Sequence, residues 1–161
     1  MQIRSATAED ADRCAEIYAP FVIDHWVSFE SSAPDGAEMG SRIGKVLDSH
    51  AWLVAEVDGI VAGYAYGSQH RSRAAYRTSC DVAVYIDPVF ARQGIGRGLY
   101  QSLFPDLKSR GFHAAFAGIA LPNEASLALH RSVGFSSVGV YREVGWKMGA
   151  WRDVEWMQRL L

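Results

Sequence analysis

Three glycines alternate with other residues in the run Arg92-Gln93-Gly94-Ile95-Gly96-Arg97-Gly98, shortly after an apolar segment that ends at Asp87-Pro88. Glycine lets backbone N–H groups approach a ligand closely, because it carries no Cβ. A helix is expected to begin here, and a helix start adds unpaired N–H donors and the positive end of the helix dipole. The spacing therefore predicts a binding site for phosphate groups.

The type of phosphate ligand is not decided by the glycines alone. A P-loop requires Gly-Lys-Ser/Thr, which is absent here. A dinucleotide-binding fold places its glycines in a first βαβ unit, whereas this turn lies in mid-chain with G-x-G-x-G spacing. A tight turn without any ligand stays open, although glycines weaken a helix start that nothing uses.

Several other side chains near this turn are able to do chemistry. Asp81 precedes it on an apolar strand, where it is a candidate base or a carboxylate that is solvated or paired with Arg77. His130 is a candidate acid or base, or a packed helical side chain. Cys80 has no activating neighbour, which favours an inert buried thiol. No ligand spacing links the remaining histidines, and no metal is expected: His25, His50, His70 and His113.

The chain that positions these residues has 161 residues, which fits a single domain spanning 1–161. It is 49% hydrophobic and 21% charged, with a net charge of −2. This charge offers no basic field for nucleic acid or an anionic membrane. No apolar run approaches the roughly 20 residues of a membrane span, and the first residues do not resemble a signal peptide. A cytoplasmic protein is expected.

Hydrophobic periodicity predicts seven strands and four helices, an α/β (α+β) fold with a mixed sheet and helices on its faces. An Asp58-Gly59 turn between apolar runs is the clearest hairpin signal. Pro20 is expected to end or bend the first helix. The expected strands are Gln2–Ala6, Trp52–Val57, Ile60–Tyr66, Asp81–Ile86, Ala114–Ala120, Phe135–Glu143 and Val154–Leu161. The expected helices are Ala11–Val22, Asp35–Ser49, the segment from the glycine turn to Arg110, and Asn123–Val133.

The glycine turn resembles the pyrophosphate loop of the GNAT acetyltransferases, whose motif is Gln/Arg-x-x-Gly-x-Gly/Ala. In the usual register, set by Gly94 and Gly96, Ala91 occupies the first position; a shifted register uses Gln93, Gly96 and Gly98. The segment from Asn123 to Phe135 resembles the family's later motif, N-x-x-S-x-x-(L)-x-x-x-x-G-F. The resemblance implies a GNAT fold, splayed between its fourth and fifth strands, with acetyl-CoA as the acetyl donor.

Within that family the chain is most similar to the phosphinothricin and methionine sulfoximine N-acetyltransferases. The likeness is carried by Trp52–Tyr66, Arg73–Thr78 and Gly145–Val154. It implies acetylation of the α-amino group of a small amino acid or analogue, such as phosphinothricin, methionine sulfoximine or methionine sulfone, by direct attack in a ternary complex. It also implies a homodimer.

The resemblance also implies roles for particular residues. Asp81 stands where these enzymes usually carry Glu; being one methylene shorter, it is expected to act as base directly or through a relay water. His130 matches a histidine with an acid/base role. The implied cofactor-binding residues are Val84, Tyr85, Ile86, Arg92, Gln93, Gly94, Ile95, Gly96, Arg97, Gly98, Asn123 and Ser126. The implied substrate-binding residues are Phe29, Arg71, Arg73, Tyr76, Tyr85 and Val154.

Two alternative functions remain at this level. One is acetylation of a larger amine, such as a peptide N-terminus, a polyamine or an aminoglycoside. The basic segment Arg71–Arg77 argues against polycationic acceptors, which prefer an acidic cleft. The other is a non-catalytic acyl-CoA-binding module, for which Asp81 in place of Glu is the one supporting feature.

Overall fold

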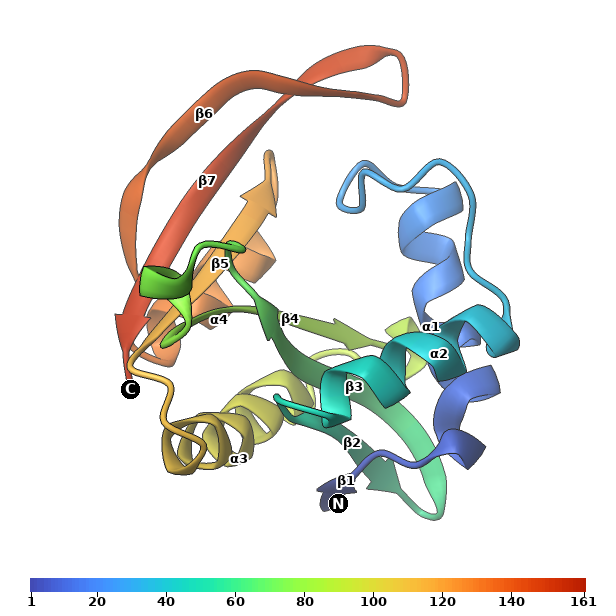
Figure 1. Ribbon diagram of the computed structural model, residues 1–161. Coiled ribbons are helices and arrows are strands. Elements are labelled where there is room, and N and C mark those ends of the chain that lie inside the picture. Colours follow the sequence, from blue (N-terminus) through green and yellow to red (C-terminus); the bar gives the residue numbers. More distant parts are fainter.

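Seven strands form one mixed sheet with helices on both faces in the computed structural model, which describes residues 1–161 (Figure 1). The strand order is β1-β2-β3-β4-β5-β7-β6. The strands are β1 (Gln2–Ser5), β2 (Trp52–Val57), β3 (Ile60–Gln69), β4 (Ser79–Ile86), β5 (Ala114–Ala120), β6 (Ser136–Lys147) and β7 (Ala150–Leu160). The helices are α1 (Ala11–Ile23), α2 (Gly36–Leu47), α3 (Ile95–Ser109) and α4 (Glu124–Ser132), with short 3₁₀ turns at Ala8–Asp10, Ala74–Tyr76 and Pro88–Phe90.

The sheet opens at its centre, where its two parallel strands meet. β4 and β5 pair only through Ser79–Asp81 and Ala114–Phe116 and then separate, whereas all other neighbouring strands are antiparallel. We call the point after the last pair, Asp81 with Phe116, the fork. The predicted splay between the fourth and fifth strands is confirmed.

Each face of the sheet carries its own hydrophobic core. Leu99, Leu103 and Leu107 of α3 pack on one face, here called the α3 face. Cys14, Ile17 and Tyr18 of α1, together with α2, pack on the other, the α1 face. Because side chains alternate along a strand, β2, β3 and β4 contribute to both cores, and neighbouring residues of β4 serve different faces.

β3 runs on to Gln69 and β4 begins at Ser79, a few residues beyond the predicted bounds, and two larger differences concern α1 and the last two strands. Pro20 lies inside α1, which continues to Ile23; near a helix end, the missing proline N–H removes only one hydrogen bond. The last two strands are longer than predicted and form a hairpin around Met148-Gly149, both at positive φ of 53° and 71°. A cross-strand pair of Trp146 and Trp151, with ring centroids 5.0 Å apart, stabilises its outer end.

Candidate active site

The glycine turn presents free backbone amides at the start of α3. Arg92 and Gly94 adopt positive φ of 63° and 77°, so the chain doubles back before Ile95. Gly98 N–H closes the first helical hydrogen bond to the carbonyl of Gly94, at 3.0 Å. The amides of Ile95, Gly96 and Arg97 therefore have no backbone acceptor, as expected for the first turn of a helix. Free amides at a helix start are the donors that the predicted anion site requires.

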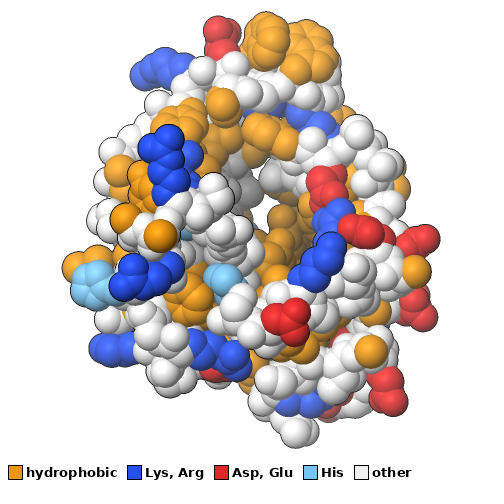
Figure 2. All heavy atoms as spheres, viewed as in Figure 1, with side chains coloured by type: hydrophobic (Ala, Val, Ile, Leu, Met, Phe, Trp, Pro, Cys, Tyr) orange, Lys and Arg blue, Asp and Glu red, His pale blue; other side chains and the backbone are white.

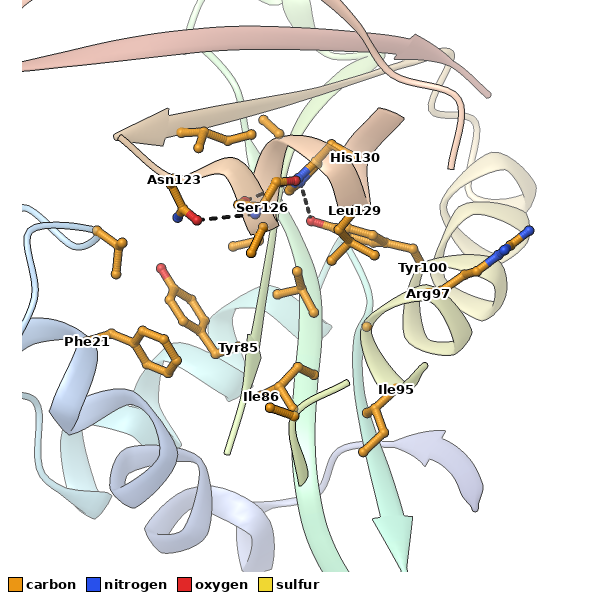
Figure 3. Close-up of a pocket in the computed structure, with 18 of the residues that line it drawn as sticks. Phe21, Tyr85, Ile86, Ile95, Arg97, Tyr100, Asn123, Ser126, Leu129 and His130 are labelled. Atoms are coloured by element: carbon orange, nitrogen blue, oxygen red, sulfur yellow. Dashed lines mark hydrogen bonds between the residues drawn. The ribbon is translucent and has the colours of Figure 1, made fainter. Parts of the chain in front are cut away.

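A cavity of about 600 Å³ opens beside these amides, between the separated strands. Figure 3 shows its wall, with Ser126, Leu129 and His130 of α4 facing Tyr85 and Ile86 of β4. Asn123 begins α4, and its side-chain oxygen accepts a hydrogen bond from the Ser126 amide at 3.2 Å. The cavity thus extends from the fork to the α3 N-terminus.

Most of the predicted cofactor residues meet in this cavity, and two do not. Val84, Tyr85, Ile86, Arg92, Gly94, Ile95, Gly96, Arg97, Asn123 and Ser126 line it. Gln93 is exposed and lies outside the lining. Gly98 faces β1 instead, where an added Cβ would lie 2.9 Å from Met1 Cε. The geometry favours the register set by Gly94 and Gly96, with Gly98 as a packing residue.

The cavity fits an extended acyl-CoA chemically. The free amides suit a pyrophosphate, and the unpaired inner edges of β4 and β5 offer backbone groups to an amide-rich pantetheine arm. Gly96 keeps the approach open, because a Cβ there would lie 3.0 Å from Leu129 Cδ2 and 3.8 Å from Val84 Cγ2. A thioester of such a ligand, when bound, supplies an activated acetyl group.

Asp81 lies at the fork on the α1 face, opposite the α3 helix. Alternation along β4 directs Cys80 and Val82 into the α3 core and leaves Asp81 and Tyr85 on the other side. The side chain of Asp81 is 31% exposed. Burial raises the pKa of this carboxyl, and the hydrogen bond from His70 opposes that shift only in part. A carboxylate with a raised pKa is a stronger base than an ordinary aspartate.

The partner of Asp81 is His70, not Arg77. His70 Nδ1 lies 2.5 Å from Asp81 Oδ1, whereas Arg77 bonds only the carbonyl of Ala74. Sequence reasoning missed His70 because it looked for metal spacing. The usable signal was strand register: β3 pairs with β4 through Ser68 opposite Asp81, which places residue 70 beside the carboxylate.

The predicted substrate residues come from several elements, and Tyr76 is the one that packs against His70, the partner of Asp81. Tyr85 packs edge-on against Tyr18 at a centroid distance of 4.8 Å. Val154 lies on β7 opposite Ala120, on the separated side of the fork. Tyr76 is 41% exposed and lies 5.9 Å from the His70 ring. Arg71 and Arg73 are exposed, and neither makes an ion pair within the chain.

The loop between α1 and α2 reaches across the sheet to the β6–β7 hairpin. Phe29 packs on the backbone of Gly145, and Lys147 Nζ donates to the carbonyls of Val22, at 2.8 Å, and Glu30. Trp26 Nε1 donates to the carbonyl of Pro122 at 3.1 Å. These contacts connect the two halves of the molecule, and Figure 2 shows the surface hollowed between them.

His130 lies in the cavity wall with both ring nitrogens engaged. Nδ1 is 2.7 Å from the carbonyl oxygen of Ser126, which can only accept, so Nδ1 carries the proton. Nε2 is then the acceptor for the hydroxyl of Tyr100, at 2.9 Å. Burial lowers the pKa of His130, which favours the neutral ring. An acid role for His130 stays a prediction; the hydrogen bonds favour positioning of α4 on α3.

Other reactive groups do not assemble into a second centre. Cys14 and Cys80 are buried free thiols. No three side chains of the types that hold metals come together, and none of the helices combines the length and apolar character needed to span a bilayer.

Comparisons with known proteins place this geometry in a family. The model of the acetyltransferase (GNAT) domain matches residues 3–156. The phosphinothricin N-acetyltransferase of Alcaligenes faecalis is 40% identical, over 99% of this chain and 82% of its own length. The methionine sulfoximine/methionine sulfone acetyltransferase of Salmonella typhimurium is 32% identical, over 98% and 93%.

Solved structures agree in fold and differ in the acceptor that they name. A phosphinothricin acetyltransferase from Sinorhizobium meliloti, in complex with acetyl-CoA, superposes with a TM-score of 0.95 at 34% identity, covering 99% of this chain and 88% of that one. A ribosomal-protein-alanine N-acetyltransferase from Brucella melitensis gives 0.96 at 34% identity, covering all of both chains. The free amides, the forked sheet and these similarities lead to one conclusion: the chain belongs to the GNAT family and is an acetyl-CoA-dependent N-acetyltransferase.

Proposed function

We propose that the enzyme acetylates the α-amino group of a small amino acid or analogue, of the phosphinothricin or methionine sulfoximine type, by direct attack in a ternary complex. The observation that carries the proposal is the position of Asp81. It lies at the fork, on the face opposite α3, and the charge of Arg71, which makes no ion pair in the chain, acts on its carboxyl. Relatives named for phosphinothricin and methionine sulfoximine support the same acceptor class.

An α-amino acid offers two charged groups, and the α1 face offers a complement to each. The ammonium must lose a proton before it can attack, which requires a base at the fork. The carboxylate calls for a guanidinium, which binds two oxygens in one plane. Arg73 is the residue we assign to that contact, with Tyr76 beside it and Arg71 as a second cation; Phe29 and Val154 border the side-chain space.

The contacts between the α1–α2 loop and the opposite half of the molecule favour a small acceptor over a long peptide. Two loop residues, Trp26 and Phe29, contact Pro122 and Gly145 of the opposite half, and Lys147 of that half bonds back to Val22. Arg152 lies over the Trp26 ring at 4.8 Å and adds to the same connection. A large acceptor requires these contacts to separate, whereas an amino acid fits beneath them.

A thiol-release assay tests the proposal with acetyl-CoA and a panel of acceptors. The panel holds methionine sulfone, methionine sulfoximine, phosphinothricin, ordinary amino acids, amines that lack the carboxylate, a polyamine and a short peptide. We expect release with the amino-acid analogues. Release with the peptide or polyamine alone refutes the proposed acceptor class, and binding of acetyl-CoA without release in any arm refutes the proposed reaction.

The Arg73→Ala variant tests how the acceptor is held. Loss of a charged hydrogen bond of about 1.5–3 kcal/mol is expected to raise the acceptor KM by about 10- to 150-fold, with little effect on the KM for acetyl-CoA. Arg77→Ala is the matched control, since Arg77 lies in the same loop but bonds only the carbonyl of Ala74. Equal effects in the two variants contradict the assignment.

A further inference from the structure

His70 completes the base at the fork. Its Nδ1 lies 2.5 Å from Asp81 Oδ1. Its ring stacks on Phe116 at a centroid distance of 4.4 Å, with Tyr76 edge-on at 5.9 Å and Trp156 at 6.3 Å. Three aromatic rings and one hydrogen bond therefore hold the imidazole in one orientation, although its side chain stays 13% exposed.

The hydrogen bond decides which nitrogen of His70 is basic. An ionised carboxylate can only accept, so with Asp81 ionised the proton of the neutral ring lies on Nδ1. Nε2 then keeps its lone pair, makes no hydrogen bond within the chain and is not sealed from solvent. In catalytic triads, a carboxylate orients an imidazole in the same way, and the free far nitrogen of the imidazole acts as the general base.

The short side chain of Asp81 limits how far its carboxylate reaches, and the imidazole of His70 extends that reach. A base one methylene shorter than Glu reaches less far from the strand. The His70 ring moves the basic atom outward by the width of an imidazole, to a position beside Phe116 on the far strand of the fork. The ring therefore lies where it could bridge the distance for which the sequence analysis expects a relay water.

We propose that Nε2 of His70 receives the proton of the attacking amine, and that Asp81 is the positioning residue that fixes the His70 tautomer. This deepens the proposed function and rests on it for the nature of the acceptor. The ammonium gives one proton to Nε2, and the amine lone pair forms the C–N bond. The C–S bond breaks with its electron pair going to sulfur, the thiolate takes the second nitrogen proton, and the imidazolium returns its proton to water.

The charged and titratable groups that face His70 are few. Asp81 faces it from β4, and Arg71 follows it in the chain. Tyr76 faces it from the 3₁₀ turn, while Phe116 of β5 and Trp156 of β7 carry no titratable group. A loss of proton transfer when residue 70 is replaced is therefore attributed to the His70–Asp81 pair.

The discriminating variant is His70→Asn, whose side-chain N–H can still donate to Asp81 while the second nitrogen is lost. If His70 is the proton acceptor, kcat falls by about 10²–10⁴-fold, and the KM for acetyl-CoA is unchanged. In His70→Ala, added imidazole restores part of kcat. His50→Asn is the matched control, since His50 stacks on Phe112 at 4.6 Å away from the fork.

The proposal is overturned if kcat in His70→Asn stays within about threefold of wild type, because the loss of a general base usually has a far larger effect. Asp81 is then the direct proton acceptor. The assay uses whichever amine wild type accepts, so a wrong acceptor class does not obscure the result. A second measurement needs no turnover: nitrogen NMR is expected to show the proton of His70 on Nδ1 in wild type, with this preference lost in Asp81→Ala. A proton on Nε2 in wild type also overturns it.

Discussion

Gly145 offers a test of whether Phe29 covers the acceptor. A Cβ at position 145 would lie 2.4, 2.7 and 2.9 Å from three carbons of the Phe29 ring. Ordinary contacts begin near 3.4 Å, so the ring must retreat by about 1 Å in Gly145→Ala. Phe29 is already 44% exposed, so the ring can turn outward rather than strain the hairpin.

The magnitude follows from the buried half of that ring. Full burial of a phenylalanine contributes about 1.5–3 kcal/mol, so losing this contact costs about 1 kcal/mol of folding free energy. If the same ring surface covers the bound acceptor, losing 1 kcal/mol of binding raises the acceptor KM about fivefold. The KM for acetyl-CoA is expected to stay unchanged, because neither Phe29 nor Gly145 lines the cavity that fits this ligand.

Gly139→Ala is the matched control on the same strand. A Cβ at Gly139 meets nothing within 4 Å, and the backbone there does not need a glycine. Steady-state kinetics with both substrates varied, together with thermal unfolding, separate the two effects. Equal acceptor KM values in Gly145→Ala and Gly139→Ala would refute a covering role for Phe29, even if the Gly145 variant is less stable.

Three further outcomes are expected. In Gly96→Ala the new Cβ would lie 3.0 Å from Leu129, which must move back by a few tenths of an ångström. Calorimetry should therefore show weaker binding of CoA. The midpoint of thermal unfolding should not fall, because alanine favours a helix over glycine. Burial raises the pKa of Asp81 above the ordinary 3.8, so the folded state holds the proton more tightly and stability falls as pH rises from about 3.8 through the raised value. Asp81→Asn should therefore be more stable than wild type at pH 7, with the gain vanishing below pH 4 in urea unfolding, and it should lose most of its activity because His70 loses its carboxylate partner. Burial raises the pKa of the Cys14 and Cys80 thiols to about 12. A disulfide reagent at pH 8 should therefore react with neither thiol until the protein is unfolded. Reaction of either thiol in the folded protein would contradict their burial.

The strands and helices near the glycine turn followed closely from local pattern. β2, β4, β5 and the α3 start lie where periodicity and turn residues put them, because those signals act over a few residues. The β6–β7 hairpin was underestimated, since its exposed Trp146 and Trp151 interrupt the apolar alternation and become meaningful only as a cross-strand pair.

The candidate site also contains residues that local spacing predicts and residues whose roles depend on tertiary contacts. Gly94 and Gly96 face the cavity, as their spacing predicts, whereas Gly98 packs toward β1. That distinction depends on which way an adjacent strand lies, which no local motif records. His130 was assigned from its place on a helix, and only the structure shows that Ser126 and Tyr100 occupy both of its nitrogens.

The sequence by itself determined the family, the cofactor and the strand that carries Asp81, because backbone amides at a glycine-rich helix start are a local property. Tertiary structure alone decided what stands beside that carboxylate. His70 is eleven positions away and meets Asp81 through strand pairing, and Phe116 arrives from a third strand across the fork. A proton acceptor is defined by its neighbours in space, and those neighbours are set by register.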